Sequence, residues 1–198
     1  MRVSAVSFGK KIPIMQSKIR DVWNRKQADV TLCEYDCKDY SDVKEILDKC
    51  DDWTYVSSFA NDMNKKRERY YEGREQYPNN FYVMEDKNKN IIGICETIDI
   101  GNDTNIEYIE SARDSIYKYV GQTMLAMVGK ILLDRGGKNL CVGNPYPGAV
   151  NFYTDKCGFE KINDDDNFFT LYMDDFQVND FIKSVQRKTG SEILDIVG

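Results

Sequence analysis

The chain has 198 residues, with a hydrophobic fraction of 41% and a charged fraction of 30%, which suits one globular domain with a substantial core. Its formal net charge of −6 argues against nucleic acid as the main partner and favours a cationic one. No apolar run approaches the roughly 20 residues of a membrane-spanning helix, and the N-terminus does not resemble a secretory signal, so we expect no membrane partner and a cytoplasmic location.

The residue types limit the chemistry further. The sequence has no histidine, which excludes serine and cysteine hydrolases with an imidazole base. Of its six cysteines only Cys33 and Cys37 are closely spaced, and not as in a zinc knuckle, so we expect buried free thiols and no metal site. Residues 1–27 carry a charge of +6 and the remainder −12. This basic segment either packs on the acidic body, which is the preferred interpretation, or forms a separate binding arm.

The first part of the chain shows strand patterns followed by helix patterns. Residues 1–27 contain two short apolar pieces that suggest a hairpin or an edge strand. Residues 28–37 are rich in β-branched and aromatic residues and predict the first regular strand. Ser41 is the expected N-cap of a short helix that ends near Cys50. Residues 58–77 predict a second helix with a thin apolar face, which is either a wall of a substrate cleft or a solvated amphipathic helix.

From Asn80 the pattern changes to strands separated by polar turns. Three apolar runs, 81–86, 91–100 and 106–112, predict an antiparallel meander. A long helix follows at 121–135, because its apolar residues recur at three- and four-residue spacing. A short strand is expected next, so the strand–helix–strand unit should be a parallel crossover.

The last third of the chain is predicted to hold a strand at 139–143, a short helix at 149–156 and a strand hairpin at 158–173. A final helix should turn Phe181, Ile182 and Val185 inward. We therefore divide the chain into an N-terminal extension, 1–27, a core domain, 28–176, and a C-terminal helical extension, 177–198.

The start of the long helix has the features of an anion site. A strand that leads through a glycine-containing turn into a helix leaves several backbone N–H groups unpaired, and these favour a phosphate. Gly121 allows a phosphate to approach the main chain, and Lys118 can add a positive charge. The alternative is that Gly121 is a turn residue before a core helix.

Two local motifs stand within this order of elements. The first is Lys118-x-x-Gly121-x-Thr123, and the second is Ala149-x-x-x-Tyr153 followed by Gly158-Phe159. Together with the element order they resemble the GNAT superfamily of acyl-CoA-dependent N-acetyltransferases. The cofactor motif of that family is Arg/Gln-x-x-Gly-x-Gly/Ala, so Lys118 and Thr123 depart from it. One additional residue separates Tyr153 from Gly158.

The resemblance implies an α/β (α+β) fold with a mixed, mostly antiparallel central sheet flanked by helices and extended at both termini. The strands at about 105–112 and 139–144 would splay apart and hold the pantetheine of acetyl-CoA. Asn144 would bind the pantetheine amides, or equally be the turn residue before Pro145. The pyrophosphate would lie on the helix start, which consists of Lys118, Tyr119, Val120, Gly121, Gln122 and Thr123.

The resemblance also assigns catalytic roles. Tyr153 would donate a proton to the departing thiolate, since a phenol is protonated at neutral pH. Glu107 and Glu110 should point to opposite sheet faces, and Glu110 is preferred as the base because it lies nearer the end of its strand. The alternatives are that this carboxylate faces solvent and that no dedicated base exists. A main-chain N–H of the same strand would stabilise the oxyanion.

These features predict an acetyl-CoA-dependent N-acetyltransferase that acts on a primary amine of a small molecule or protein by direct attack in a ternary complex. The acceptor is expected to be cationic, such as a polyamine, an amino sugar or antibiotic, or a protein amino group. A homodimer is compatible with the sequence. The alternative is a catalytically inactive module of the same fold that binds acyl-CoA or a protein.

Overall fold

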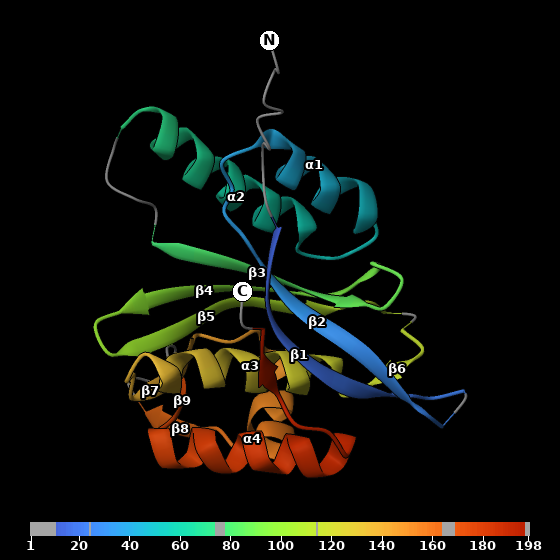
Figure 1. Ribbon diagram of the computed structural model, residues 1–198. Coiled ribbons are helices and arrows are strands. Elements are labelled where there is room, and N and C mark those ends of the chain that lie inside the picture. The colour runs from blue at the N-terminus through green and yellow to red at the C-terminus, as the bar shows by residue number, and fades with distance from the viewer. Residues whose placement is uncertain (1–10, 24, 74–77, 114, 164–168, 197–198) are drawn as a thin grey trace.

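A ten-stranded mixed sheet forms the middle layer of the computed structural model, with helices on both faces (Figure 1). The structure describes residues 11–23, 25–73, 78–113, 115–163 and 169–196. Within these ranges the strand order is β10-β1-β2-β3-β4-β5-β7-β9-β8, and β6 pairs with β1 off this path. One pair, β5 with β7, is parallel and the others are antiparallel. The expected mixed, mostly antiparallel sheet flanked by helices is therefore confirmed.

The chain begins with a long hairpin of β1, Lys11–Asp21, and β2, Gln27–Tyr35. The sequence pattern was compatible with an edge strand here, but β1 lies inside the sheet, because β10, Leu194–Asp195, pairs with part of its second edge. No pattern in the sequence indicated the two-residue strand β10. The first apolar piece of the N-terminal segment falls outside the described residues.

The far end of β1 holds the segment that leads into the long helix. β6, Tyr117–Lys118, pairs with β1 at Asp21 and Arg20, and the Val22 N–H donates to the Ile116 carbonyl at 2.7 Å. This contact joins the N-terminal strand to the predicted anion site.

Two helices, α1, Tyr40–Lys49, and α2, Val56–Tyr71, cover one face of the sheet. Ser41 is not the N-cap of α1. The N-cap is Asp39, whose carboxylate accepts the Ser41 N–H at 2.8 Å and so satisfies a free donor of the first turn. α1 ends at the predicted place. α2 ends at Tyr71, before the predicted end at residue 77, and is followed by Gly73, which takes the left-handed conformation with a φ of 62°.

The centre of the chain follows the prediction closely. β3, Asn79–Asp86, β4, Ile91–Ile100, and β5, Asp103–Ser111, form the antiparallel meander. α3, Val120–Asp134, and β7, Asn139–Gly143, complete the parallel crossover. These are the segments with the longest periodic patterns, which explains why they could be predicted.

After β7 the chain forms a 3₁₀ turn, Pro147–Ala149, and a π-helical turn, Phe152–Cys157, where one short helix was expected. β8, Glu160–Asn163, and β9, Phe169–Met173, form the predicted hairpin. α4, Asp175–Thr189, follows.

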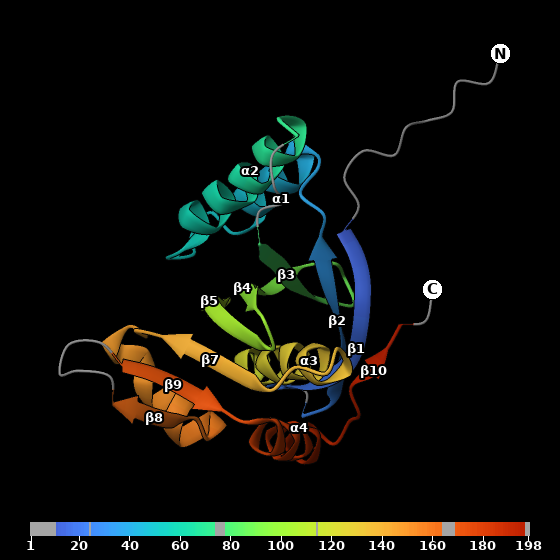
Figure 2. The same cartoon turned by 90° about the vertical axis from the view of Figure 1, so that its left-hand side faces the viewer.

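α4 starts earlier than predicted because of a capping box. The Asp174 carboxylate accepts the Gln177 N–H at 2.8 Å, and the Gln177 side chain accepts the Asp174 N–H at 2.9 Å. Phe181, Ile182 and Val185 are buried as expected, and α4 packs beside α3 on the second face of the sheet, as Figure 2 shows.

The sheet separates two hydrophobic cores. Adjacent residues of β2 point to opposite sides, so Leu32 belongs to the core under α3 and α4, and Cys33 to the core under α1 and α2. The six cysteines are free thiols, as expected, and all except the half-buried Cys141 are buried. Burial raises the pKa of the Cys50 thiol to about 12.

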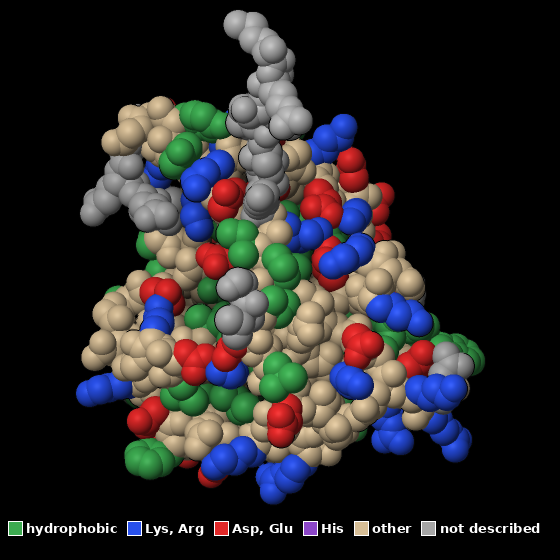
Figure 3. All heavy atoms as spheres, in the orientation of Figure 1, with side chains coloured by type: hydrophobic (Ala, Val, Ile, Leu, Met, Phe, Trp, Pro, Cys, Tyr) green, Lys and Arg blue, Asp and Glu red, His purple; other side chains and the backbone are tan. Residues whose placement is uncertain are grey.

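The charged surface shows how part of the basic N-terminal segment is used. The Lys11 ammonium pairs with Glu45 at 2.8 Å and with the fully buried Glu85. Other Lys and Arg side chains gather at the lower right of the face in Figure 3, around the end of the β1–β2 hairpin and β6. Across the described ranges, the helices lack the length and apolar character required to cross a bilayer.

Glu96 on β4 is a carboxyl group with no access to solvent. The Asn79 side-chain amide donates to its Oε1, and within the described structure its Oε2 has no hydrogen-bond partner. Burial raises the pKa of this carboxyl to about 8, and the negative charges of Asp62 and Glu107 act in the same direction.

We expect Glu96→Gln to stabilise the fold increasingly as the pH rises. Since the folded-state pKa of about 8 exceeds the ordinary value of 4.5, the folded wild type binds more protons than the unfolded chain between these values. Its free energy of unfolding therefore falls as the pH rises through this window, and the glutamine variant lacks this one contribution. Urea denaturation across the window measures the difference, with Glu68→Gln as the control, because Glu68 is exposed on α2 and does not act on the pKa of Glu96. A difference that does not vary with pH would contradict the buried ionisation.

Candidate active site

The parallel strands β5 and β7 pair only at their beginnings. The last paired residues are Asn105 and Cys141, although β5 continues to Ser111. Beyond this point the strands diverge, as the ribbons in Figure 2 show, and leave a cleft of about 830 Å³. The lining residues come from β5, from β7 and the turns after it, and from the loop before α2: Tyr55, Ile106, Glu107, Tyr108, Ile109, Val142, Gly143, Asn144, Pro145, Tyr146, Pro147, Gly148, Ala149 and Tyr153.

A β-bulge shapes the β5 side of the cleft. Tyr108 pairs with Glu96 and Ile106 with Thr97, so Glu107 is the extra residue. After the bulge, the Ala112 N–H donates to a carbonyl of β4 at 3.1 Å. The alternation along the strand therefore turns the main-chain groups of Ile109 and Ser111 away from β4, towards the gap where β7 has departed.

The same bulge decides which glutamate reaches the cleft. Glu107 lines it, and the Asn105 side-chain amide donates to the Glu107 carboxylate. Glu110 was preferred from the sequence, but its two carboxylate oxygens accept the main-chain N–H groups of Thr54 and Tyr55 at 2.9 and 3.0 Å. The geometry thus assigns Glu110 to holding the start of α2 against β5. The preference for Glu110 rested on its position near the end of the strand, which could not reveal a contact with a loop more than 50 residues away.

Tyr153, the predicted proton donor, lies in the lining of the cleft. Its side chain is 5% exposed, and its ring packs edge to face against Phe152 and Phe159. A phenol is protonated at neutral pH, and burial raises the pKa of the Tyr153 hydroxyl further above its usual value.

The additional residue between Tyr153 and Gly158 forms the π-helical turn. The Phe159 N–H donates to the Tyr153 carbonyl at 3.0 Å, and the Gly158 N–H donates to the Thr154 carbonyl at the same distance. A wider helical turn accommodates one more residue without displacing its ends. Tyr153 therefore keeps its place beside the cleft.

A second hollow, of about 320 Å³, lies at the start of α3. Four of the predicted phosphate-binding residues line it: Tyr119, Val120, Gly121 and Gln122. Lys118 and Thr123 do not. Lys118 belongs to β6, and Thr123 is fully buried with its N–H bound to the Tyr119 carbonyl at 2.8 Å.

The start of α3 is held in an unusual conformation. Tyr119 has a φ of 69°, which is uncommon for a residue with a large side chain and marks local strain of the kind found at functional sites. The Gln122 side chain donates to the Lys156 carbonyl at 2.7 Å. A Cβ at Gly121 would lie 3.2 Å from the Phe152 ring, so the helix start and the π-helical turn pack against each other through this glycine.

Several lining residues were not identified from the sequence. Arg113, from the loop before α3, lines the second hollow, and its guanidinium donates to the Thr54 hydroxyl. Tyr55 reaches the cleft from a loop far away in the sequence, so no local pattern could indicate it. Tyr146 could have been noticed, since it lies in the same turn as Asn144, which lines the cleft with a φ of 44°.

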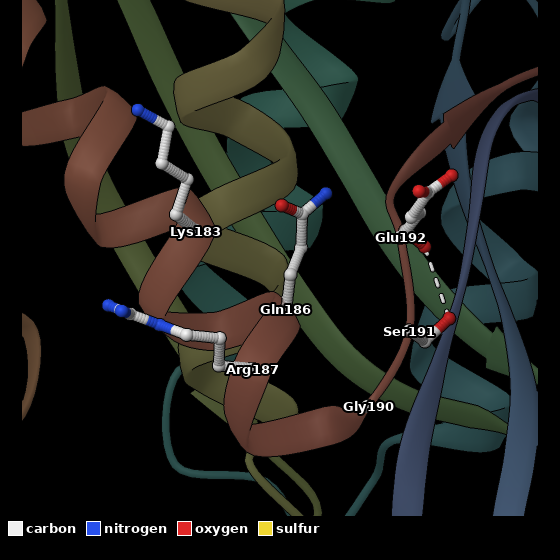
Figure 4. Close-up of a pocket in the computed structure, with 6 residues that line it drawn as sticks. All are labelled: Lys183, Gln186, Arg187, Gly190, Ser191 and Glu192. Atoms are coloured by element: carbon white, nitrogen blue, oxygen red, sulfur yellow. Dashed lines mark hydrogen bonds between the residues drawn. The ribbon is translucent and has the colours of Figure 1, made fainter.

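A third hollow lies at the C-terminal end of α4, with a volume of about 500 Å³ (Figure 4). Figure 4 shows Lys183 and Arg187 pointing away from the segment that carries Ser191 and Glu192. This hollow contains none of the predicted site residues. Among the described residues, no group of three or more cysteine, aspartate or glutamate side chains is arranged to hold a metal ion.

No family model matches the chain, and no curated protein sequence matches it. Solved structures do. The apo form of FdhC, a nucleotide-linked sugar GNAT, is 13% identical, covers 91% of this chain and 99% of its own, and has a TM-score of 0.60.

Two further structures are similar over a shorter span. The PaiA N-acetyltransferase from Thermoplasma acidophilum, in complex with coenzyme A, is 18% identical, with 73% of this chain and 98% of its own covered and a TM-score of 0.53. A spermidine N-acetyltransferase, SpeG, from Vibrio cholerae is 18% identical, with 75% and 95% covered and a TM-score of 0.54. With its diverging parallel strand pair and its crossover helix, the chain has the fold of the GNAT acetyltransferases.

Proposed function

We propose that the chain is an acetyl-CoA-dependent N-acetyltransferase whose active site is the cleft between β5 and β7. The observation that carries the proposal is the early end of the β5–β7 pairing beside the start of α3. A pantetheine arm can occupy the gap and pair with the main-chain carbonyl of Ile109 and the main-chain groups of Ser111, which face away from β4. The free N–H groups at the start of α3 suit the pyrophosphate. Arg113 adds a positive charge beside the same hollow.

The side chains in the cleft supply the groups that acetyl transfer needs. A C–N bond forms between the acceptor amine and the acetyl carbon, and the C–S bond of the thioester breaks. An alkylammonium has a pKa of roughly 10, so it must lose a proton before attack, and the Glu107 carboxylate accepts it. The Ile109 N–H donates to the oxyanion, and Tyr153 protonates the departing thiolate. Asn105 orients Glu107 through its side-chain amide.

The acceptor in this proposal is a cationic amine, because Glu107 brings a negative charge to the cleft. By their names, one of the similar proteins is a spermidine N-acetyltransferase and another is a nucleotide-linked sugar GNAT. A cytoplasmic location and a homodimer stay predictions. A module that binds acyl-CoA without catalysis is the alternative, and the departures from the cofactor motif at Lys118 and Thr123 favour it.

Acetyl-CoA binding is the first test. Calorimetric titration of the wild type should show saturable binding, and Gly121→Glu should abolish it, because the new carboxylate would occupy the phosphate position. Gly121→Ala is the matched control: its small side chain contacts Phe152 and should weaken binding only in part. If the wild type does not bind acetyl-CoA at millimolar concentration, the proposed acetyltransferase activity is excluded.

Tyr153→Phe removes the proposed proton donor and keeps the ring that packs against Phe152 and Phe159. We expect kcat to fall by about 100-fold, the lower end of the range for loss of a general acid, with acetyl-CoA affinity unchanged. Release of the CoA thiol, followed with a thiol reagent, measures the rate. Unchanged turnover would show that another group protonates the thiolate.

Glu107→Gln and Glu110→Gln separate the two carboxylates. The first should lower kcat/KM by about 100-fold and flatten the acidic limb of its pH profile, because the base is lost. The second should leave the pH profile unchanged and lower the unfolding midpoint, since one acceptor for the Thr54 and Tyr55 N–H groups becomes a donor. The opposite pattern would restore Glu110 as the base.

A further inference from the structure

We infer that the acceptor carries one ammonium group next to a ring, and is not a linear polyamine. This inference rests on the proposed acetyl transfer in the cleft between β5 and β7. It goes further by choosing among the cationic amines through the charge and shape of the described lining.

The charge of the cleft is the first observation. Among the described residues that line it, Glu107 is the one that is acidic or basic. An ammonium group that leaves water for a cleft needs a partner of opposite charge or several acceptors. The single carboxylate of Glu107 can neutralise the charge of one ammonium group. A molecule with several ammonium groups along a chain would leave the others without a counter-charge in the described lining.

The aromatic rings are the second observation. Tyr108 follows Glu107 on β5, and its ring centroid lies 5.8 Å from that of Tyr55, with 34° between the ring planes. Tyr146 faces the cleft from the turn after β7, on the opposite side, and 69% of this residue is exposed. Aromatic surface thus lies on both sides of the space beside the carboxylate. Faces of this kind bind flat bodies and attract a nearby cation.

A hydrogen bond outside the cleft fixes the position of the Tyr55–Tyr108 pair. Glu110 accepts the Tyr55 N–H at 3.0 Å and so joins the loop before α2 to the strand that carries Tyr108. Two rings from distant parts of the chain are therefore held next to one carboxylate. Because these side chains are already ordered, binding of an acceptor costs less conformational entropy. A ring gains contact with both faces, whereas a linear aliphatic chain covers less of them. Sugar rings and aromatic rings both meet this description.

The experiment compares acceptors on one enzyme preparation. The CoA thiol released from acetyl-CoA is followed with 2-phenylethylamine, glucosamine, putrescine and spermidine. We expect kcat/KM for at least one of the two ring amines to exceed that for both polyamines by about tenfold, and the better of the two identifies the kind of ring. Equal or better use of the polyamines would overturn the inference, and so would transfer to neither ring amine. Acetyl-CoA binding to the same preparation is titrated in parallel, since a protein that does not bind acetyl-CoA would overturn the proposed function itself.

Variants of the tyrosine pair provide an independent measurement. Tyr108→Ala should raise KM for the ring amine by about tenfold and leave KM for acetyl-CoA unchanged, whereas Tyr108→Phe should keep the wild-type value. Tyr70→Ala is the matched control, since Tyr70 is an exposed tyrosine on α2 that does not line the cleft. Thermal unfolding verifies that each variant is folded. An unchanged KM for the ring amine in folded Tyr108→Ala would contradict the aromatic contact.

Discussion

The structure depends on one interrupted row of hydrogen bonds, the parallel pairing of β5 and β7 that stops after Asn105 and Cys141. A main-chain N–H that is neither paired nor hydrated costs free energy, so a strand that loses its neighbour must meet water or a ligand. The consequence is an open cleft inside an otherwise continuous sheet. The bulge at Glu107 lies directly after this point and turns a carboxylate into the cleft.

The elements around this opening are tied to one another by contacts between distant parts of the chain. β1 holds β6 and with it the entrance of α3, Glu110 holds the loop before α2, and Gln122 holds the π-helical turn. Each tie uses a main-chain group, so it constrains position more strictly than apolar packing does. The side chains that face the cleft are thereby placed on a rigid frame, as catalysis and selective binding require.

The chemistry of the cleft between β5 and β7 depends on which side chains in and near it are charged. The fully buried Glu96 is held in the neutral form near pH 7 by its surroundings, because its pKa is raised to about 8. Glu107, on the exposed rim, brings a negative charge to the cleft, and the buried Tyr153 keeps its proton. Burial thus decides the protonation of Glu96, whereas Tyr153 keeps its proton because the ordinary pKa of a phenol is roughly 10 and burial raises it further.

The sequence by itself determined the central order of elements, the meander, the crossover helix and the place of Tyr153, because long periodic patterns and a motif at a helix start are local properties. Only the tertiary structure decided which glutamate lines the cleft and which aromatic side chains lie beside it. The bulge at Glu107 depends on pairing with β4, and the capture of Glu110 by the loop before α2 joins residues more than 50 positions apart. Tyr55 is likewise brought to the cleft by that contact. Period and spacing describe one segment at a time, so they could not indicate which side chains from different segments meet.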